Sequence, residues 1–183
     1  VTMSEMDDFD CKWLTPLIEF KDYGYDWEKY NEKLYEIFVH DFIDNPFLFE
    51  KQKIQVRVNP KEGNYEHAFI HLTCTSTGMT DDPNDRIPDL DRCARIKWNR
   101  EIIENYICEY SCTSCKKILY YEHYYKGNIR INLVFVDARF KVILEKRKSY
   151  VLLITGYYMK FNNIIKKEFK RYDLYKKQKA PLD

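Results

Sequence analysis

The stretch ILYYEHYYKGNIRINLVFVDARFKVILEKRKSYVLLITGYYM, residues 118–159, decides the fold. It contains four runs of apolar, aromatic and β-branched residues, which are separated by short breaks at Gly127, at Asp137 and Ala138, and at Lys148 and Ser149. Runs of this composition with short turns between them are typical of consecutive strands. The sequence therefore predicts an antiparallel meander of about four strands.

Helical patterns flank this meander. Asp26 is a good N-cap for a first helix that ends at Asn45 and Pro46, and its apolar residues recur at spacings of three and four. This stripe, which we interpret as core packing, consists of Trp27, Tyr30, Leu34, Ile37, Phe38 and Phe42. A second helix is predicted over residues 89–105, and a strongly basic one over residues 162–177.

The region between the first two helices predicts a hairpin. Residues 54–58, IQVRV, alternate like a half-buried strand, Pro60 and Gly63 favour a turn, and residues 68–73 predict the returning strand. Residues 77–88 predict a polar loop. The fold class is therefore α+β, with an antiparallel sheet of about four to six strands packed by an N-terminal helix, a central helix and a basic C-terminal helix.

Length and composition favour one domain over residues 1–183. Hydrophobic residues make up 45% of the chain, which is enough for a sizeable core. We divide the domain into an acidic helical part (1–50), a core (51–177) and a tail (178–183). No apolar run approaches 18 residues, the start of the sequence lacks a secretory pattern, and six cysteines are too few for a disulfide scaffold. We therefore expect a cytoplasmic protein without membrane association.

Charge is unevenly distributed along the chain. Residues 1–50 hold 4 basic and 13 acidic side chains, whereas the remaining residues hold 26 basic and 16 acidic ones. A basic C-terminal portion is what a polyanion would meet, through release of counterions. The alternative is that these lysines simply solvate the outer faces of strands and of the last helix.

Residues 65–100 carry the most informative polar groups. His71 lies at the end of the predicted returning strand, next to Thr73, and four arginines follow: Arg86, Arg92, Arg95 and Arg100. Imidazole moves protons near neutral pH, and guanidinium holds phosphate in a planar fork, so this combination suits metal-free acid–base chemistry on a phosphodiester. The alternatives are that His71 is a packed core residue, and that the arginines pair with nearby carboxylates on the surface. His67 shares a face with His71, but no HExxH motif supports a catalytic zinc pair.

Two further groups are candidates. Thr155, Tyr157 and Tyr158 end the longest apolar strand, where a hydroxyl could bind a phosphate oxygen, although strand aromatics are usually core residues. Cys108, Cys112 and Cys115 are closely spaced, and a structural zinc site would take its fourth ligand from Cys93 or Cys74. The alternative for the cysteines is free thiols in a loop, and no cofactor is expected to take part in catalysis.

Taken together, these segments resemble the barnase, EndoU, colicin and RelE-like ribonuclease superfamily, and within it the phage- and mobile-element-associated branch. The resemblance covers most of residues 50–177. It lies in FIHLT (69–73), DRIPDLDRCARIKW (85–98), RFKVILEKRKSYVLLITGYY (139–158) and the basic last helix. This chain departs from the pattern in having Gly-Tyr-Tyr after Thr155, where many relatives have a proline close behind the tyrosine, and in its cysteine loop.

The resemblance implies a toxin-like, metal-independent endoribonuclease with its site on the open face of the sheet. The ribose 2′-hydroxyl would attack the adjacent phosphorus and leave a 2′,3′-cyclic phosphate and a 5′-hydroxyl. By the same resemblance, His71 would be the general acid or base, Arg92 and Arg95 would hold the phosphate, and Thr155 would bond a non-bridging oxygen. Tyr157 or Tyr158 would stack on a base or act as the partner acid. The remaining RNA contacts would come from Arg86, Arg100, Tyr158 and Lys141.

Two classes of partner follow from this resemblance: RNA as substrate, and an antitoxin or immunity protein as inhibitor. The main alternative is a non-catalytic module on the same fold that binds nucleic acid or protein, because a fold does not fix a function. A third hypothesis is an interaction protein stabilised by zinc at the cysteines.

Overall fold

The meander is present as predicted. The structure, a computed structural model, describes residues 11–80, 82, 85–112 and 118–179. The four long strands are β5 (Ile118–Tyr125), β6 (Asn128–Phe135), β7 (Phe140–Lys146) and β8 (Val151–Tyr158). Each pairs antiparallel with the next, and a register shift between Ile143 and Leu144 interrupts the β7–β8 ladder.

The sheet is larger than the meander and is mixed. Within the described residues it has six strands in the order β1-β2-β8-β7-β6-β5, where β1 is Leu48–Phe49 and β2 is Gln52–Val56. β2 lies parallel to β8, with Ile54 opposite Val151 and Val56 opposite Leu153. The prediction of an α+β fold with four to six strands is confirmed, but the sheet is not purely antiparallel.

The prediction that residues 68–73 form the returning strand of a hairpin is wrong. Residues His67–Thr73 form helix α2. The buried side chains Ala68 and Leu72, and likewise Phe69 and Thr73, are four residues apart, which is the spacing of one helical face. A seven-residue apolar segment fits either period, so its alternation did not distinguish a strand from a short helix. With no hairpin partner at this segment, β2 pairs with β8 instead.

The N-terminal helix is confirmed, and the central one is divided. Helix α1 (Trp27–Phe38) starts at Asp26, whose carboxylate accepts a hydrogen bond from the Lys29 amide, and it continues into the π-helix η3 (Val39–Asp44). Asp89 caps the short helix α3 (Leu90–Cys93), a tight turn follows, and helix α4 (Trp98–Asn105) then runs to the predicted end. The predicted polar loop contains β4 (Arg86–Pro88), which pairs with β3 (Cys74–Ser76).

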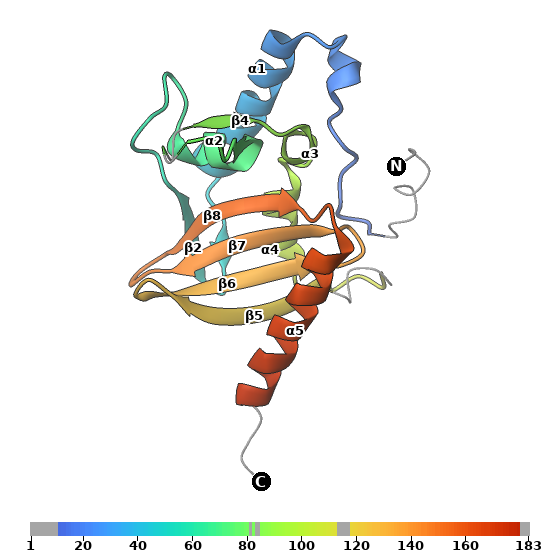
Figure 1. Ribbon diagram of the computed structural model, residues 1–183, viewed down its shortest axis with the longest axis vertical. Helices are drawn as coiled ribbons and strands as arrows, with labels where there is room; N and C mark the ends of the chain where they lie inside the picture. Colours follow the sequence, from blue (N-terminus) through green and yellow to red (C-terminus); the bar gives the residue numbers. More distant parts are fainter. Residues whose placement is uncertain (1–10, 81, 83–84, 113–117, 180–183) are drawn as a thin grey trace.

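The two faces of the sheet differ in chemistry. One face carries Leu133, Phe135 and Phe140, which pack in the main core together with α1 and α4. The residues between them on each strand point the other way, and we call this side the polar face. Cross-strand register places Tyr121, Asn132, Ile143 and Thr155 in one row of it. Figure 1 shows helix α5 (Asn162–Lys179) crossing the front of the meander, with α4 behind.

Helix α5 is fixed to the polar face through one buried ionic cluster. Glu168, the buried residue of α5, accepts hydrogen bonds from Lys141 at 2.7 Å, from Arg171 at 2.8 Å and from the Tyr121 hydroxyl. The Lys141 and Glu168 side chains are each 2% exposed. Within the described residues, no helix is long and apolar enough to cross a lipid bilayer.

Candidate functional site

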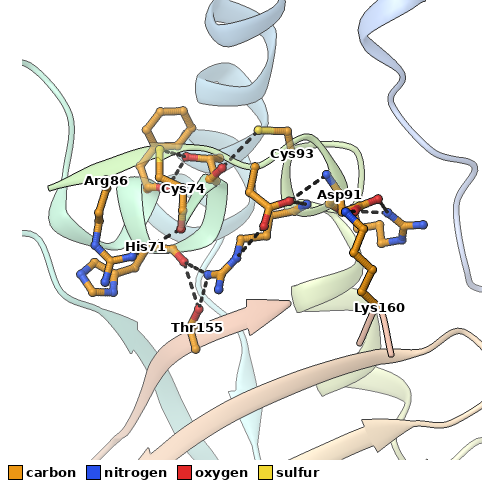
Figure 2. A network of polar contacts seen from close by, with 12 residues as sticks. His71, Cys74, Arg86, Asp91, Cys93, Thr155 and Lys160 are labelled. Atoms are coloured by element: carbon orange, nitrogen blue, oxygen red, sulfur yellow. Dashed lines mark hydrogen bonds and ion pairs between the residues drawn. The ribbon is translucent and has the colours of Figure 1, made fainter. Parts of the chain in front are cut away.

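Helix α2 is held against β8 through the main chain of His71. The His71 carbonyl accepts hydrogen bonds from Arg92 Nη1 at 2.9 Å and from the Thr155 hydroxyl at 3.0 Å. Arg92 Nη1 also donates to Thr155 Oγ1 at 3.1 Å, so the three groups form a closed triangle (Figure 2). Three residues predicted to act together are therefore in contact, but the hydrogen bonds of Arg92 and Thr155 go to the carbonyl of His71 and position the helix that carries it.

The imidazole of His71 packs against that of His67, with the two rings tilted by 33°. The two residues lie one helical turn apart on α2, and their ring centroids are 4.1 Å apart. Both line a cavity of 310 Å³, which we call the histidine pocket. Its wall is completed by the ends of strands β6 to β8 and by the turn between β5 and β6.

The histidine pocket is basic. Its described lining includes four cationic side chains and one carboxylate: Arg57, Lys126, Arg130, Arg147 and Glu145. Glu145 pairs with Arg130 at 3.2 Å and with Arg147, and it is 4% exposed. One buried carboxylate is shared by two of the four cations, so the described lining keeps a net positive charge that suits an anion.

Burial and nearby cations keep both histidines neutral. Burial first, and then the positive charge of Arg86, lower the pKa of His71 to about 3. Burial and the charges of Arg57 and Arg86 also lower the pKa of His67. Figure 2 shows Arg86 beside His71. An anion in the pocket would oppose the effect of these cations and raise the pKa of both imidazoles.

Two buried atoms of the pocket residues lack a hydrogen-bond partner within the described part of the chain. They are Nδ1 of His67 and Nε of Arg147. A buried polar atom without a partner is costly, and its presence in a native fold calls for a ligand or an ordered water. The lack of a partner at these two atoms is therefore consistent with a pocket that binds a polar group.

Other predicted RNA-binding and catalytic residues have structural partners. Arg95 is 4% exposed, donates to the Asp91 carbonyl at 2.9 Å and stacks on Tyr158 at 4.2 Å. Arg100 donates to the carbonyls of Asp41 and Asn45, at 2.7 and 2.8 Å, and so closes the end of the π-helix. These contacts hold α3, α4 and η3 together, away from the histidine pocket.

Lys141 and Tyr157 lie on the polar face under α5. Lys141 is engaged by Glu168 and Tyr121, so its ammonium is not directed to solvent. Burial raises the pKa of the Tyr157 hydroxyl, and Arg92 lies 5.7 Å from the centre of its ring. Tyr157 lines a second cavity, next to the histidine pocket.

The predicted zinc ligands lie in two places. Cys93 is buried, and its thiol donates to the Thr73 carbonyl at 3.3 Å, while burial raises its pKa to about 12. Cys108 and Cys112 are neighbours, with their sulfurs 3.8 Å apart, and Cys115 lies outside the described residues. In the described part of the chain, no group of three or more His, Cys, Asp or Glu side chains is arranged to hold a metal ion. Structural zinc at these cysteines stays a prediction.

Sequence reasoning missed most of the histidine pocket. His67 was considered as a metal ligand and not as a partner of His71, although their spacing of four predicts contact once the segment is helical. Arg57, Arg130 and Arg147 sit in or beside strands, where alternating charges look like ordinary solvated positions. Comparison of the chain with protein-family models, with curated proteins and with solved structures finds no match.

Proposed function

We propose that the protein is a metal-independent endoribonuclease whose active site is the histidine pocket. The observation that carries this proposal is the contact between the imidazoles of His67 and His71 inside a cavity lined by four cationic side chains. Phosphate contact is the usual role of clustered arginine, and paired imidazoles can supply both the acid and the base of a phosphodiester cleavage. His71 keeps its predicted role as acid or base, whereas other arginines than Arg92 and Arg95 line the pocket.

In the free protein the imidazole of His71 is neutral at pH 7, because burial and nearby cations lower its pKa. A bound phosphate raises that pKa towards the working pH, which strengthens the imidazole as a base for the proton of a ribose 2′-hydroxyl. The 2′-oxygen then attacks phosphorus, and the bond from phosphorus to the 5′-oxygen breaks. The leaving 5′-oxygen takes a proton from His67, whose pKa the bound phosphate raises. The products are a 2′,3′-cyclic phosphate and a 5′-hydroxyl.

The arginines divide into two roles. Arg57 and Arg147 line the pocket and would hold the non-bridging phosphate oxygens, where they stabilise the additional negative charge of the transition state. Arg92 and Thr155 are positioning residues, since they fix the main chain of His71.

The test compares histidine variants in a cleavage assay. Wild type, His71→Ala, His67→Ala and His40→Ala are incubated with total RNA in EDTA, and fragment ends are analysed for cyclic phosphate. His40 is the matched control, because its side chain is 72% exposed on η3. We expect the first two variants to lose about 100-fold or more in rate, and the control to keep wild-type activity. Cleavage by His71→Ala at the wild-type rate would refute the proposal, provided that circular dichroism shows the variants folded.

A non-catalytic RNA-binding module is the second candidate. It is favoured by the fact that Arg92, Arg95 and Thr155 are all engaged by structural partners. In this case wild-type protein would leave RNA intact but bind a labelled RNA in a fluorescence anisotropy titration. Binding would weaken with rising salt and in Arg147→Ala.

A further inference from the structure

A second cavity opens on the polar face of the sheet, between strands β5 to β8 and helix α5. It has a volume of 410 Å³, and we call it the tyrosine pocket. Four tyrosines are among its described lining residues: Tyr121, Tyr125, Tyr157 and Tyr175. Tyr125 and Arg130 line this pocket and the histidine pocket alike, and the Arg130 guanidinium lies 3.8 Å from the centre of the Tyr125 ring. The two cavities therefore share one wall made of a stacked cation and aromatic ring.

Asn132 offers an unused acceptor in the tyrosine pocket. Its side chain is completely buried, and its Nδ2 group lies 3.3 Å from the Tyr121 carbonyl, to which it donates, and 2.9 Å from Nδ1 of His123. These contacts fix the orientation of the amide. Its Oδ1 atom is buried and has no hydrogen-bond partner within the described residues. A ligand that places an N–H group against Oδ1 would satisfy it.

Each described cation that lines the tyrosine pocket is already paired with a carboxylate. Lys141 and Arg171 both pair with Glu168, and Arg130 pairs with Glu145. An anion would therefore have to compete with buried carboxylates for every one of these three cations. A neutral, planar group with an N–H donor can stack on the tyrosines and donate a hydrogen bond to Asn132 Oδ1. A nucleobase has these properties.

We propose that the tyrosine pocket binds one unstacked nucleobase of an RNA strand whose phosphate lies in the histidine pocket. The base lies against the tyrosines, and Asn132 Oδ1 accepts a hydrogen bond from one of its N–H groups. This inference rests on the proposed function, because it takes the occupant of the neighbouring pocket to be the phosphate of the same strand. In this arrangement the protein recognises one base next to the scissile bond.

The experiment measures the affinity of small nucleotides for the full chain by isothermal titration calorimetry. The probes are the four ribonucleoside 5′-monophosphates and ribose 5-phosphate, which lacks the base. We expect the best nucleotide to bind about 5- to 150-fold more tightly than ribose 5-phosphate, as stacking on aromatic side chains supplies in single-strand binding. An analogue of that nucleotide, methylated on the N–H groups of its base, should lose affinity by about 5-fold or more.

The matched variants are Tyr125→Leu and Tyr124→Leu. Both residues lie in β5 near its turn, but Tyr125 lines the pocket while its neighbour Tyr124, on the other side of the strand, is 75% exposed. Tyr125→Leu should remove most of the preference for the nucleotide over ribose 5-phosphate, and Tyr124→Leu should leave it unchanged. Equal effects of the two variants, or nucleotides binding no more tightly than ribose 5-phosphate, would overturn the inference.

The outcomes separate this inference from the proposed function. RNA cleavage that depends on His71, together with nucleotides that bind no better than ribose 5-phosphate, would support the proposed ribonuclease activity and refute the nucleobase site. If nucleotides bind with the expected preference and RNA stays intact, the base pocket stands as part of a binding module.

Discussion

The ionic cluster under α5 predicts an unequal response to the loss of its two buried charged members, Glu168 and Lys141. In Glu168→Gln, Lys141 keeps its Tyr121 contact at 2.9 Å but loses its counter-charge while remaining buried. In Lys141→Met, Glu168 still accepts from Arg171 at 2.8 Å and from Tyr121. A buried charge without its partner costs about 3–5 kcal/mol, whereas loss of one hydrogen bond to a charged group costs about 1.5–3 kcal/mol. We therefore expect Glu168→Gln to reduce the free energy of unfolding more than Lys141→Met does.

Urea unfolding at pH 7, followed by tryptophan fluorescence, measures both variants and their double mutant. A pH series gives a second test. Burial lowers the pKa of Lys141 below its ordinary value of 10.5, so between the two pKa values the unfolded chain binds more protons than the folded one, and stability rises with pH. In Glu168→Gln this rise should be steeper and begin at lower pH than in wild type, and Lys141→Met should lack it. Equal losses in the two single variants, or a stability of Glu168→Gln that does not change between pH 7 and 10, would refute the reasoning.

Three further predictions concern the fold around the candidate site. Because burial and Arg86 lower the pKa of His71 to about 3, the unfolded chain alone binds a proton there between pH 6.5 and 3, so stability falls with falling pH. His71→Gln should make this fall shallower in thermal melts, and an unchanged pH profile would contradict the assignment. In Gly156→Ala, the added Cβ would lie 1.8 Å from Asn99 Oδ1, so we expect a loss of about 1–3 kcal/mol in urea unfolding. Asn99→Ala in the same chain should recover much of it, and additive losses would contradict this packing. Thr155→Val removes a hydrogen bond to the His71 carbonyl, so the free energy of unfolding should fall by about 1 kcal/mol and amide hydrogen exchange in α2 should become faster. Unaltered exchange in α2 would contradict the role of Thr155 in holding that helix.

The meander and the first helix were predictable because their signals are long. Each strand from β5 to β8 has at least seven residues, and the apolar stripe that includes Tyr30, Leu34 and Phe38 repeats over several turns. Helix α2 has seven residues and was predicted as a strand, because a period of 2 and a period of 3.6 cannot be separated over so short a run. The parallel pairing of β2 with β8 could not be predicted either, because strand pairing between distant segments depends on the tertiary fold.

The candidate site was predicted in part. His71, Arg92 and Thr155 do lie together, but their contact runs through the His71 carbonyl, and a sequence does not show which atoms of a residue are used. His67 would have been included had residues 67–73 been predicted as helical. Arg147 lies in the connection between β7 and β8 and reaches the pocket only because β8 brings α2 beside it.

The parallel pairing of β2 with β8 affects when the pocket can form during synthesis. Ile54 can pair with Val151 only after strands β3 to β7 have been synthesised between them, so closing this ladder carries the entropy cost of a long loop. Arg57 follows β2, and residues 152–154 of β8 form part of the histidine pocket. A nascent chain that lacks β8 therefore has both histidines but no cavity to hold them. The histidine pocket therefore becomes complete only after β8 has been synthesised, later than both of its histidines.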